Sequence, residues 1–129
     1  MARILLIEDN DPIRALLREN LELEGHTVIE ARNGQEGLDL FRQAGADLVI
    51  TDILMPETEG LGVLVELRNA QPPVKVIVMS GGGRDNLATA KLLGAAKVLL
   101  KPFPIAVLIA AIDELLPGAG ASAQPSVSQ

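Results

Sequence analysis

Short apolar runs alternate with longer amphipathic stretches along most of the chain. Five runs are too short and too uniformly apolar for half-exposed strands, so they predict strands covered on both faces. They span residues 4–7, 27–29, 48–50, 74–79 and 98–100. Alternating strands and helices require right-handed crossovers, which place the strands in one parallel sheet between two layers of helices. The pattern therefore predicts an α/β fold with a doubly wound, five-stranded parallel sheet.

Local signals mark where the intervening helices begin and end. Asp11 before Pro12 indicates an N-cap with proline in the first turn, and Asn33 with Glu36 three residues later indicates a second N-cap. Three helices stop at a glycine just before the next strand, where a positive φ is expected, at Gly25, Gly45 and Gly94. The predicted helices run from about residue 12 to 24, 33 to 44, 60 to 67, 85 to 93, and 104 to 116.

Composition and charge exclude several classes of protein. The 129 residues, 48% of them apolar, fit one domain with a sizeable core. The net charge is −6, and thirteen of the seventeen acidic residues lie within the first sixty, which argues against a nucleic-acid surface. The lack of cysteine excludes disulfides and thiolate chemistry, and no apolar run reaches the length of a signal-peptide core or a membrane span. We therefore expect a cytoplasmic protein that binds neither membranes nor nucleic acid.

The end of the chain differs in composition from the rest. Residues 118–129 carry no charge and few large apolar side chains, so they cannot offset the entropy lost on ordering. We expect one domain at residues 1–117, followed by a flexible tail or the start of a linker at residues 118–129.

Polar residues interrupt the apolar runs at one end of the predicted strands. Glu8 and Asp9 follow the first strand, Asp52 follows the third, Ser80 follows the fourth and Lys101 follows the fifth. In open parallel sheets, ligands bind outside the carboxyl ends of the strands. We therefore expect these five side chains to meet at one edge of the sheet.

Three carboxylates within this group predict a cation site. Like charges repel, so such a cluster either takes up protons or binds a cation. Oxygen ligands without histidine or cysteine favour Mg²⁺. A carboxylate beside Mg²⁺, an ammonium and a hydroxyl has the groups needed to accept a phosphoryl group. We predict Asp52 as the nucleophile, Lys101 as the charge that orients the incoming anion, and Ser80 as a hydroxyl that binds a phosphoryl oxygen.

Each of these residues, taken singly, also has a simpler structural interpretation. Glu8 and Asp9 could be charges at a helix start, and Asp52 could be a turn residue. Ser80 could be a loop hydroxyl and Lys101 a solvated charge. The functional interpretation is favoured because all five are expected at the same edge.

Four stretches, in chain order, carry a resemblance to a known family. They are ILLIEDND with the acidic pair, DLVITDILMPETEG with the nucleophile, VIVMSGGG with the hydroxyl and GAAKVLLKPF with the lysine. From residue 3 to about residue 116, the chain resembles the receiver domain of two-component response regulators. The resemblance implies a flavodoxin-like fold, with five helices around a sheet in the strand order 2-1-3-4-5.

The resemblance also implies roles for individual residues and partners. Mg²⁺ would be held by Glu8, Asp9, Asp52 and the backbone carbonyl of Leu54, and the peptide bond after Lys101 would be cis. A sensor histidine kinase or a histidine phosphotransfer protein would donate the phosphoryl group. The fourth helix, fifth strand and fifth helix would form the surface that meets a downstream protein or a second copy of the chain. Such a domain catalyses only its own phosphorylation and dephosphorylation.

Three positions depart from the usual family pattern. Val98 stands three positions before the lysine, where the family usually has an aromatic switch residue, and the chain has no tyrosine. Leu54 and Gly82 occupy positions that influence hydrolysis of the phosphoryl group in the family, and neither carries a group that orients a water molecule. We therefore expect slow self-dephosphorylation.

Other functions remain open from the sequence. In a phosphorelay intermediate or phosphate sink, Asp52 would pass the phosphoryl group to a histidine of another protein without a conformational output. A Mg²⁺-dependent phosphohydrolase with an aspartyl-phosphate intermediate is less favoured, because Leu54 stands where such an enzyme needs a second Asp. A Ser-His-Asp hydrolase has weak support: Ser80 lacks a glycine two residues before it, and His26, the single histidine, precedes a predicted strand.

Overall fold

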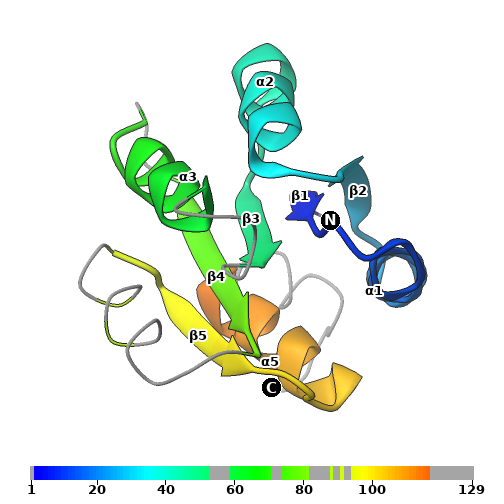
Figure 1. The fold of residues 1–129 in the computed structure, drawn as a ribbon. Coiled ribbons are helices and arrows are strands. Elements are labelled where there is room, and N and C mark those ends of the chain that lie inside the picture. Colours follow the sequence, from blue (N-terminus) through cyan, green and yellow to red (C-terminus); the bar gives the residue numbers. More distant parts are fainter. Residues whose placement is uncertain are drawn as a thin grey trace.

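The computed structural model describes residues 2–52, 59–70, 74–81, 88, 91 and 94–116, which form one parallel sheet flanked by helices (Figure 1). The strands are β1 (Arg3–Ile7), β2 (Thr27–Ala31), β3 (Leu48–Asp52), β4 (Lys75–Ser80) and β5 (Lys97–Leu100). The helices are α1 (Asp11–Leu23), α2 (Gly34–Ala44), α3 (Glu59–Arg68) and α5 (Ile105–Leu115). The strand order is β2-β1-β3-β4-β5, which confirms the predicted doubly wound fold and its order.

Four of the five predicted helices fall within the described residues. The helix predicted at residues 85–93 lies mainly outside them, although Ala88 and Lys91 are helical. The tail predicted at residues 118–129 also lies outside the described residues. Within the described part of the chain, no helix combines the length and apolar character that crossing a membrane requires.

The side chains of the central strands point alternately to two helical layers. In β1, Leu5 packs in a buried cluster with residues of α2 and α3, whereas the next residue, Leu6, packs in a second cluster with residues of α1 and α5. Figure 1 shows the same division, with α2 and α3 on one side of the sheet and α1 and α5 on the other. Burial of apolar surface on both faces therefore holds the strands, and with them the residues at their ends, in one arrangement.

The strands differ in burial according to their place in the sheet. β3 is buried throughout, and β1 and β4 are buried after their first residue, as predicted. β2 and β5 are mostly half-buried, although Val28 and Ile29 of β2 and Val98 and Leu99 of β5 pack against the clusters on the two faces. The predicted cover on both faces is therefore confirmed, but β2 and β5 are less fully buried than the other three strands. These two strands form the edges of the sheet, where a strand has only one neighbouring strand.

The helix caps agree with the predictions except at α1. Asn33 Oδ1 accepts a hydrogen bond from the backbone N–H of Glu36 at 2.8 Å, which confirms the predicted start of α2. The cap of α1 is Asn10 rather than the predicted Asp11, because Asn10 Oδ1 accepts the N–H of Ile13 at 2.9 Å. Both residue types cap helices well, so sequence preference could not separate the two neighbours. The three predicted helix ends have positive φ, with 93° at Gly25, 71° at Gly45 and 106° at Gly94.

A close approach between α2 and β1 requires a glycine at position 37. A methyl group there would lie 2.4 Å from Cδ1 and 2.7 Å from Cγ1 of Ile7, which is fully buried. We expect Gly37→Ala to lower the free energy of unfolding by about 1–3 kcal/mol, because overpacking outweighs the gain in helix propensity. Urea unfolding measures the change.

Gly62→Ala in α3 is the matched control. A methyl group at Gly62 would meet no other atom within 4 Å, and this glycine is exposed. This substitution should raise the free energy of unfolding by about 0.5–1 kcal/mol through helix propensity alone. Equal effects of the two substitutions would contradict the tight packing of α2 on β1.

Candidate functional site

Four strands bring the predicted polar residues to one edge of the sheet. Glu8 directly follows β1, Asp52 ends β3, Ser80 ends β4 and Lys101 directly follows β5. Because the strands are parallel, all of these residues lie at carboxyl ends. β1 and β3 are neighbours, and the chain reverses its direction across the sheet here, because β2 lies on the far side of β1. A reversal of this kind marks the ligand-binding position of open α/β sheets.

Three carboxylates meet at this edge, as predicted. Glu8, Asp9 and Asp52 each offer one oxygen, and these oxygens all lie within 4.8 Å of one another. Glu8 and Asp52 are buried, with 1% and 5% of their surface exposed, whereas Asp9 is exposed. This set fits Mg²⁺, which is bound through a few carboxylates and keeps several water molecules. The acidic cluster therefore has the composition and spacing of a metal site.

The ammonium of Lys101 lies between two of these carboxylates. Its Nζ donates to Asp52 Oδ2 at 2.7 Å and to Glu8 Oε1 at 2.9 Å. Burial alone would lower the pKa of Lys101, but the hydrogen bonds to Asp52 and Glu8 outweigh it and raise the pKa. For Glu8, burial raises the pKa against the opposing hydrogen bonds from Lys101 and the backbone of Asn10. A fixed positive charge thus lies beside Asp52, next to a buried carboxylate that is costly to keep ionised.

Ser80 lies next to Lys101 at the ends of β4 and β5. It is fully buried, and its backbone carbonyl accepts a hydrogen bond from the N–H of Lys101 at 2.8 Å. In the pairing of β3 with β4, Asp52 lies opposite Met79, the residue before Ser80. The structure therefore brings Ser80 to the same edge as Asp52.

The positions that depart from the family pattern are only partly within the described residues. Val98 pairs with Val78 across β4 and β5, and its half-buried side chain packs against the cluster on the α2 and α3 side. Leu54 and Gly82 lie outside the described residues. The peptide bond after Lys101 is cis, as the resemblance implied.

Two residues that the sequence analysis did not assign to the site hold the loop after β1. The backbone N–H of Asn10 donates to Glu8 Oε2 at 3.1 Å, and Nη1 of Arg14 donates to the backbone carbonyl of Glu8 at 2.8 Å. Asn10 had a local signal, since it precedes a helix and is a good capping residue. Arg14 had none, because its contact depends on the path of the loop in space.

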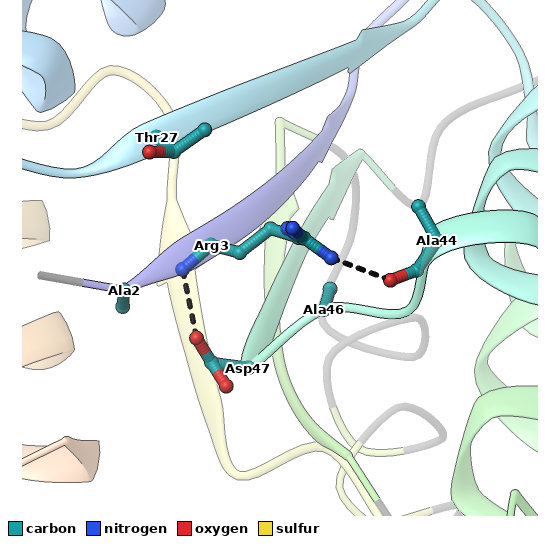
Figure 2. Close-up of a pocket in the computed structure, with 6 residues that line it drawn as sticks. All are labelled: Ala2, Arg3, Thr27, Ala44, Ala46 and Asp47. Carbon is teal, nitrogen blue, oxygen red and sulfur yellow. Dashed lines mark hydrogen bonds between the residues drawn. The ribbon is translucent and has the colours of Figure 1, made fainter.

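A hollow of about 450 Å³ lies at the opposite edge of the sheet (Figure 2). Arg3 and Thr27, the first residues of β1 and β2, line it together with Asp47. Arg3 donates through its backbone N–H to Asp47 Oδ2 at 2.8 Å and through Nη1 to the carbonyl of Ala44 at 2.6 Å. The charged side chains of Arg3 and Asp47 thus each bind a backbone group, and they lie at the amino ends of the strands, away from the usual ligand position. The edge that contains Asp52 is therefore the candidate site.

His26 also lies at the amino-terminal edge, just before β2. The N–H of Ala2 donates to its Nδ1 at 3.3 Å, and burial lowers the pKa of His26, which favours the neutral ring. Ser80 lies at the other edge, so this geometry does not suit a Ser-His-Asp hydrolase. His26 thus lies just before a strand, as its sequence position indicated.

Comparison with known proteins finds one family over most of the chain. Residues 4–113 match the family model of the response regulator receiver domain. The chain is 38% identical over 117 residues to the transcriptional regulatory protein CpxR of Escherichia coli strain K12, covering 90% of this chain and 50% of CpxR. It is 33% identical over 116 residues to sporulation initiation phosphotransferase F of Bacillus subtilis strain 168, covering 89% of this chain and 94% of that protein.

A solved structure has the same fold. The CheY-like response regulator receiver domain protein from Methanospirillum hungatei JF-1 matches with a TM-score of 0.85 and 28% identity, over 95% of this chain and 98% of that chain. The curated relatives differ in length, and the chain spans between 12% and 50% of several longer ones. Those longer relatives contain sequence that has no counterpart in this chain.

Proposed function

Because the chain belongs to the family of response regulator receiver domains, we propose that it is a phosphoacceptor of two-component signalling with Asp52 as the phosphorylated residue. Receiver domains in general receive signals rather than act as enzymes on other substrates. One observation carries the proposal. Asp52 lies 2.7 Å from the ammonium of Lys101, in a cluster of three carboxylates that are close enough to share one cation.

In the proposed reaction, a carboxylate oxygen of Asp52 attacks the phosphorus atom of a donor. The bond from phosphorus to the donor breaks, its electron pair leaves with the donor group, and an acyl phosphate forms on Asp52. The ammonium of Lys101 orients one phosphoryl oxygen, and the hydroxyl of Ser80 donates a hydrogen bond to another. The low exposure of Asp52 strengthens these interactions, because they act in a poorly solvated setting.

The metal site in this proposal consists of Glu8, Asp9, Asp52 and the backbone carbonyl of Leu54. Bound Mg²⁺ supplies positive charge that neutralises the phosphoryl oxygens. Lys101 donates to Oε1 of Glu8 at 2.9 Å, and the carboxylate keeps lone pairs that could bind a cation.

Mg²⁺ dependence tests the proposal directly. The purified chain, incubated with a small acyl phosphate and Mg²⁺, should gain the mass of one phosphoryl group, as read by intact mass spectrometry. Excess chelator should slow the reaction by about a hundredfold or more, because charge neutralisation in the transition state is lost. Equal labelling with and without the chelator would contradict the proposed role of the carboxylate cluster.

The partners follow from the same proposal. We place this chain in the cytoplasm, where a sensor histidine kinase or a histidine phosphotransfer protein donates the phosphoryl group to the domain of residues 1–117, and residues 118–129 form a tail or linker. Residues 85–93, β5 and α5 form the surface for a downstream protein or for a second copy of the chain. Leu100 of β5 and Val107 of α5 support this, because both large apolar side chains are exposed. A net charge of −6 gives this domain alone no attraction for nucleic acid.

A phosphorelay intermediate is the second candidate function. The chain covers 94% of sporulation initiation phosphotransferase F, and Val98 replaces the aromatic residue of the usual switch. Affinity for a downstream partner, measured before and after phosphorylation, separates the two candidates. A switch changes its affinity, whereas a relay changes only which protein carries the phosphoryl group. The phosphohydrolase alternative has no comparable support.

We expect the phosphorylated chain to lose its phosphoryl group slowly, over minutes or longer. Leu54 and Gly82 carry no polar group that orients an attacking water molecule. After removal of the donor, timed quenching and intact mass measure the decay. Leu54→Asn should speed the decay by about tenfold, because an amide can position water. A half-life of seconds in the native chain would show that other groups orient the water.

A further inference from the structure

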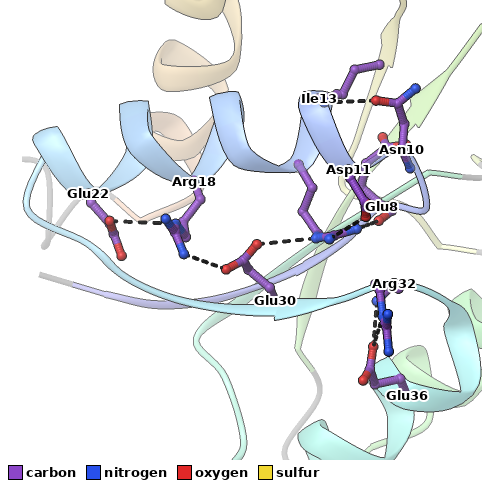
Figure 3. A network of polar contacts seen from close by, with 10 residues as sticks. Glu8, Asn10, Asp11, Ile13, Arg18, Glu22, Glu30, Arg32 and Glu36 are labelled. Atoms are coloured by element: carbon purple, nitrogen blue, oxygen red, sulfur yellow. Dashed lines mark hydrogen bonds and ion pairs between the residues drawn. The ribbon is translucent and has the colours of Figure 1, made fainter.

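Arg14 of α1 connects the acidic loop after β1 to strand β2. Its guanidinium donates from Nη1 to the backbone carbonyl of Glu8 at 2.8 Å, from Nη2 to Asp11 at 2.6 Å and from Nε to Glu30 at 3.2 Å. The side chain of Arg14 is largely buried, with 12% of its surface exposed. Figure 3 shows Glu30 between Arg18 and the start of α1, where Glu8 and Asp11 also lie. Three of the five guanidinium donors are thus directed to three separate parts of the fold.

The carbonyl that Arg14 binds belongs to the peptide group between Glu8 and Asp9. The orientation of this peptide plane sets the direction in which the chain continues to Asp9. Other contacts hold the Glu8 side of the loop: its backbone N–H donates to the carbonyl of Ala31 at 3.0 Å, and its side chain accepts the N–H of Asn10. Asp9 is exposed, so burial does little to fix it.

We propose that Arg14 is a positioning residue for the acidic pair, which orients the peptide between Glu8 and Asp9 so that both carboxylates face Asp52. The inference rests on the proposed function, because it assigns Arg14 a role toward the Mg²⁺ site. The guanidinium itself would not be a ligand of the ion, because its nitrogens donate to Glu8, Asp11 and Glu30. It acts through the backbone of Glu8 and is itself held by Glu30 of β2.

Because Arg14 is positively charged, the direction in which its replacement changes the Mg²⁺ affinity distinguishes an electrostatic role from a positioning role. A positive charge near a cation site repels the cation, so its removal would tighten Mg²⁺ binding if electrostatics alone mattered. Asp11 and Glu30 partly compensate this charge. A positioning role predicts the opposite result, since loss of the hydrogen bond to Glu8 would misplace two ligands.

Mg²⁺ affinity of the folded chain tests the inference, measured by isothermal titration at a temperature below unfolding. Arg14→Gln should weaken Mg²⁺ binding by about tenfold or more, as is usual when a group that orients a metal ligand is lost. Arg14→Lys should not restore the affinity, because one ammonium cannot reproduce three separate guanidinium contacts. Arg14→Lys retains the positive charge and most of the packing of the side chain. Its Mg²⁺ affinity therefore tests the inference if Arg14→Gln is unstable.

Arg18→Gln is the matched control. Arg18 lies one turn further along α1, donates to the same Glu30 at 2.7 Å and pairs with Glu22, and both of these partners lie outside the acidic loop. Its replacement should change the Mg²⁺ affinity by less than about twofold. Thermal unfolding without metal gives the structural cost of each variant separately.

Two outcomes would overturn the inference. Equal or tighter Mg²⁺ binding by Arg14→Gln and Arg14→Lys, compared with Arg18→Gln, would reduce Arg14 to a structural ion pair. A native chain that binds no Mg²⁺ would overturn the proposed function as well, so the two failures are distinguishable.

Discussion

Asp52→Asn is expected to abolish phosphorylation of the chain by a small acyl phosphate in the presence of Mg²⁺. The amide is a poor nucleophile, and it removes one of three carboxylates from the cation cluster. The fold should persist, because asparagine keeps an oxygen that can accept the hydrogen bond from Lys101. Intact mass should show one phosphoryl adduct on the native chain and none on the variant.

Asp47→Asn is the control for this experiment. Asp47 is exposed at the opposite edge of the sheet, where it accepts the backbone N–H of Arg3. Its variant should be phosphorylated at the native rate. An adduct of equal size on Asp52→Asn would place the modification on another residue and contradict the assignment of Asp52.

Lys101→Met is expected to lower the free energy of unfolding by about 3 kcal/mol at neutral pH without a divalent cation. The ammonium contacts Glu8 and Asp52, which are 1% and 5% exposed, and its replacement removes a positive charge from between two buried carboxylates. Urea unfolding in chelator measures the loss. Addition of Mg²⁺ should recover part of it, because a cation that binds only the folded state stabilises that state.

The pH dependence of the same variant has a definite sign. Burial raises the pKa of Glu8, so the folded chain takes up a proton at a higher pH than the unfolded chain does. Acidification through the pH range in which Glu8 takes up this proton therefore raises the free energy of unfolding. Lys101 opposes the rise in the pKa of Glu8, so its removal should enlarge this gain in stability. Urea unfolding in chelator at about pH 5.5 and about pH 7 measures this effect. The difference in free energy of unfolding between Lys101→Met and the native chain should be smaller at the lower pH.

Lys97→Met provides the comparison for the lysine experiment. Lys97 begins β5 and pairs with Glu114, but both side chains are substantially exposed. An exposed pair contributes about 1 kcal/mol or less, so this variant should lose little stability and should gain nothing from Mg²⁺. Similar losses in Lys101→Met and Lys97→Met would contradict a buried charge cluster at the site.

Local patterns predicted much of this protein because they report local physics. A run of apolar residues without alternation predicted the buried central strands, and Asn33 with Glu36 predicted the start of α2. Local patterns gave a wrong or incomplete prediction for one helix cap and for the two edge strands. They placed the cap of α1 at Asp11, whereas the cap is Asn10, and they could not tell an edge strand from a central one.

Whether a strand lies at the edge or in the centre depends on the order of all the strands in the sheet. The predicted runs at residues 27–29 and 98–100 are apolar enough for central strands, yet β2 and β5 have a neighbouring strand on one side only. The strand order comes from the packing of helices on both faces, which no short window of sequence contains. Family resemblance supplied the order 2-1-3-4-5 before the structure confirmed it.

The sequence by itself determined the fold class, the glycine ends of three helices and the five chemically suited residues, because strand ends in a parallel sheet fall at one edge whatever the details of packing. Only the tertiary structure decided how these residues meet. Lys101 lies 93 positions after Glu8, yet its ammonium contacts both Glu8 and Asp52. Arg14 reaches Glu30 because α1 packs beside β2. Such contacts depend on distances across the assembled sheet, which require the buried core to place the strand ends within hydrogen-bonding reach.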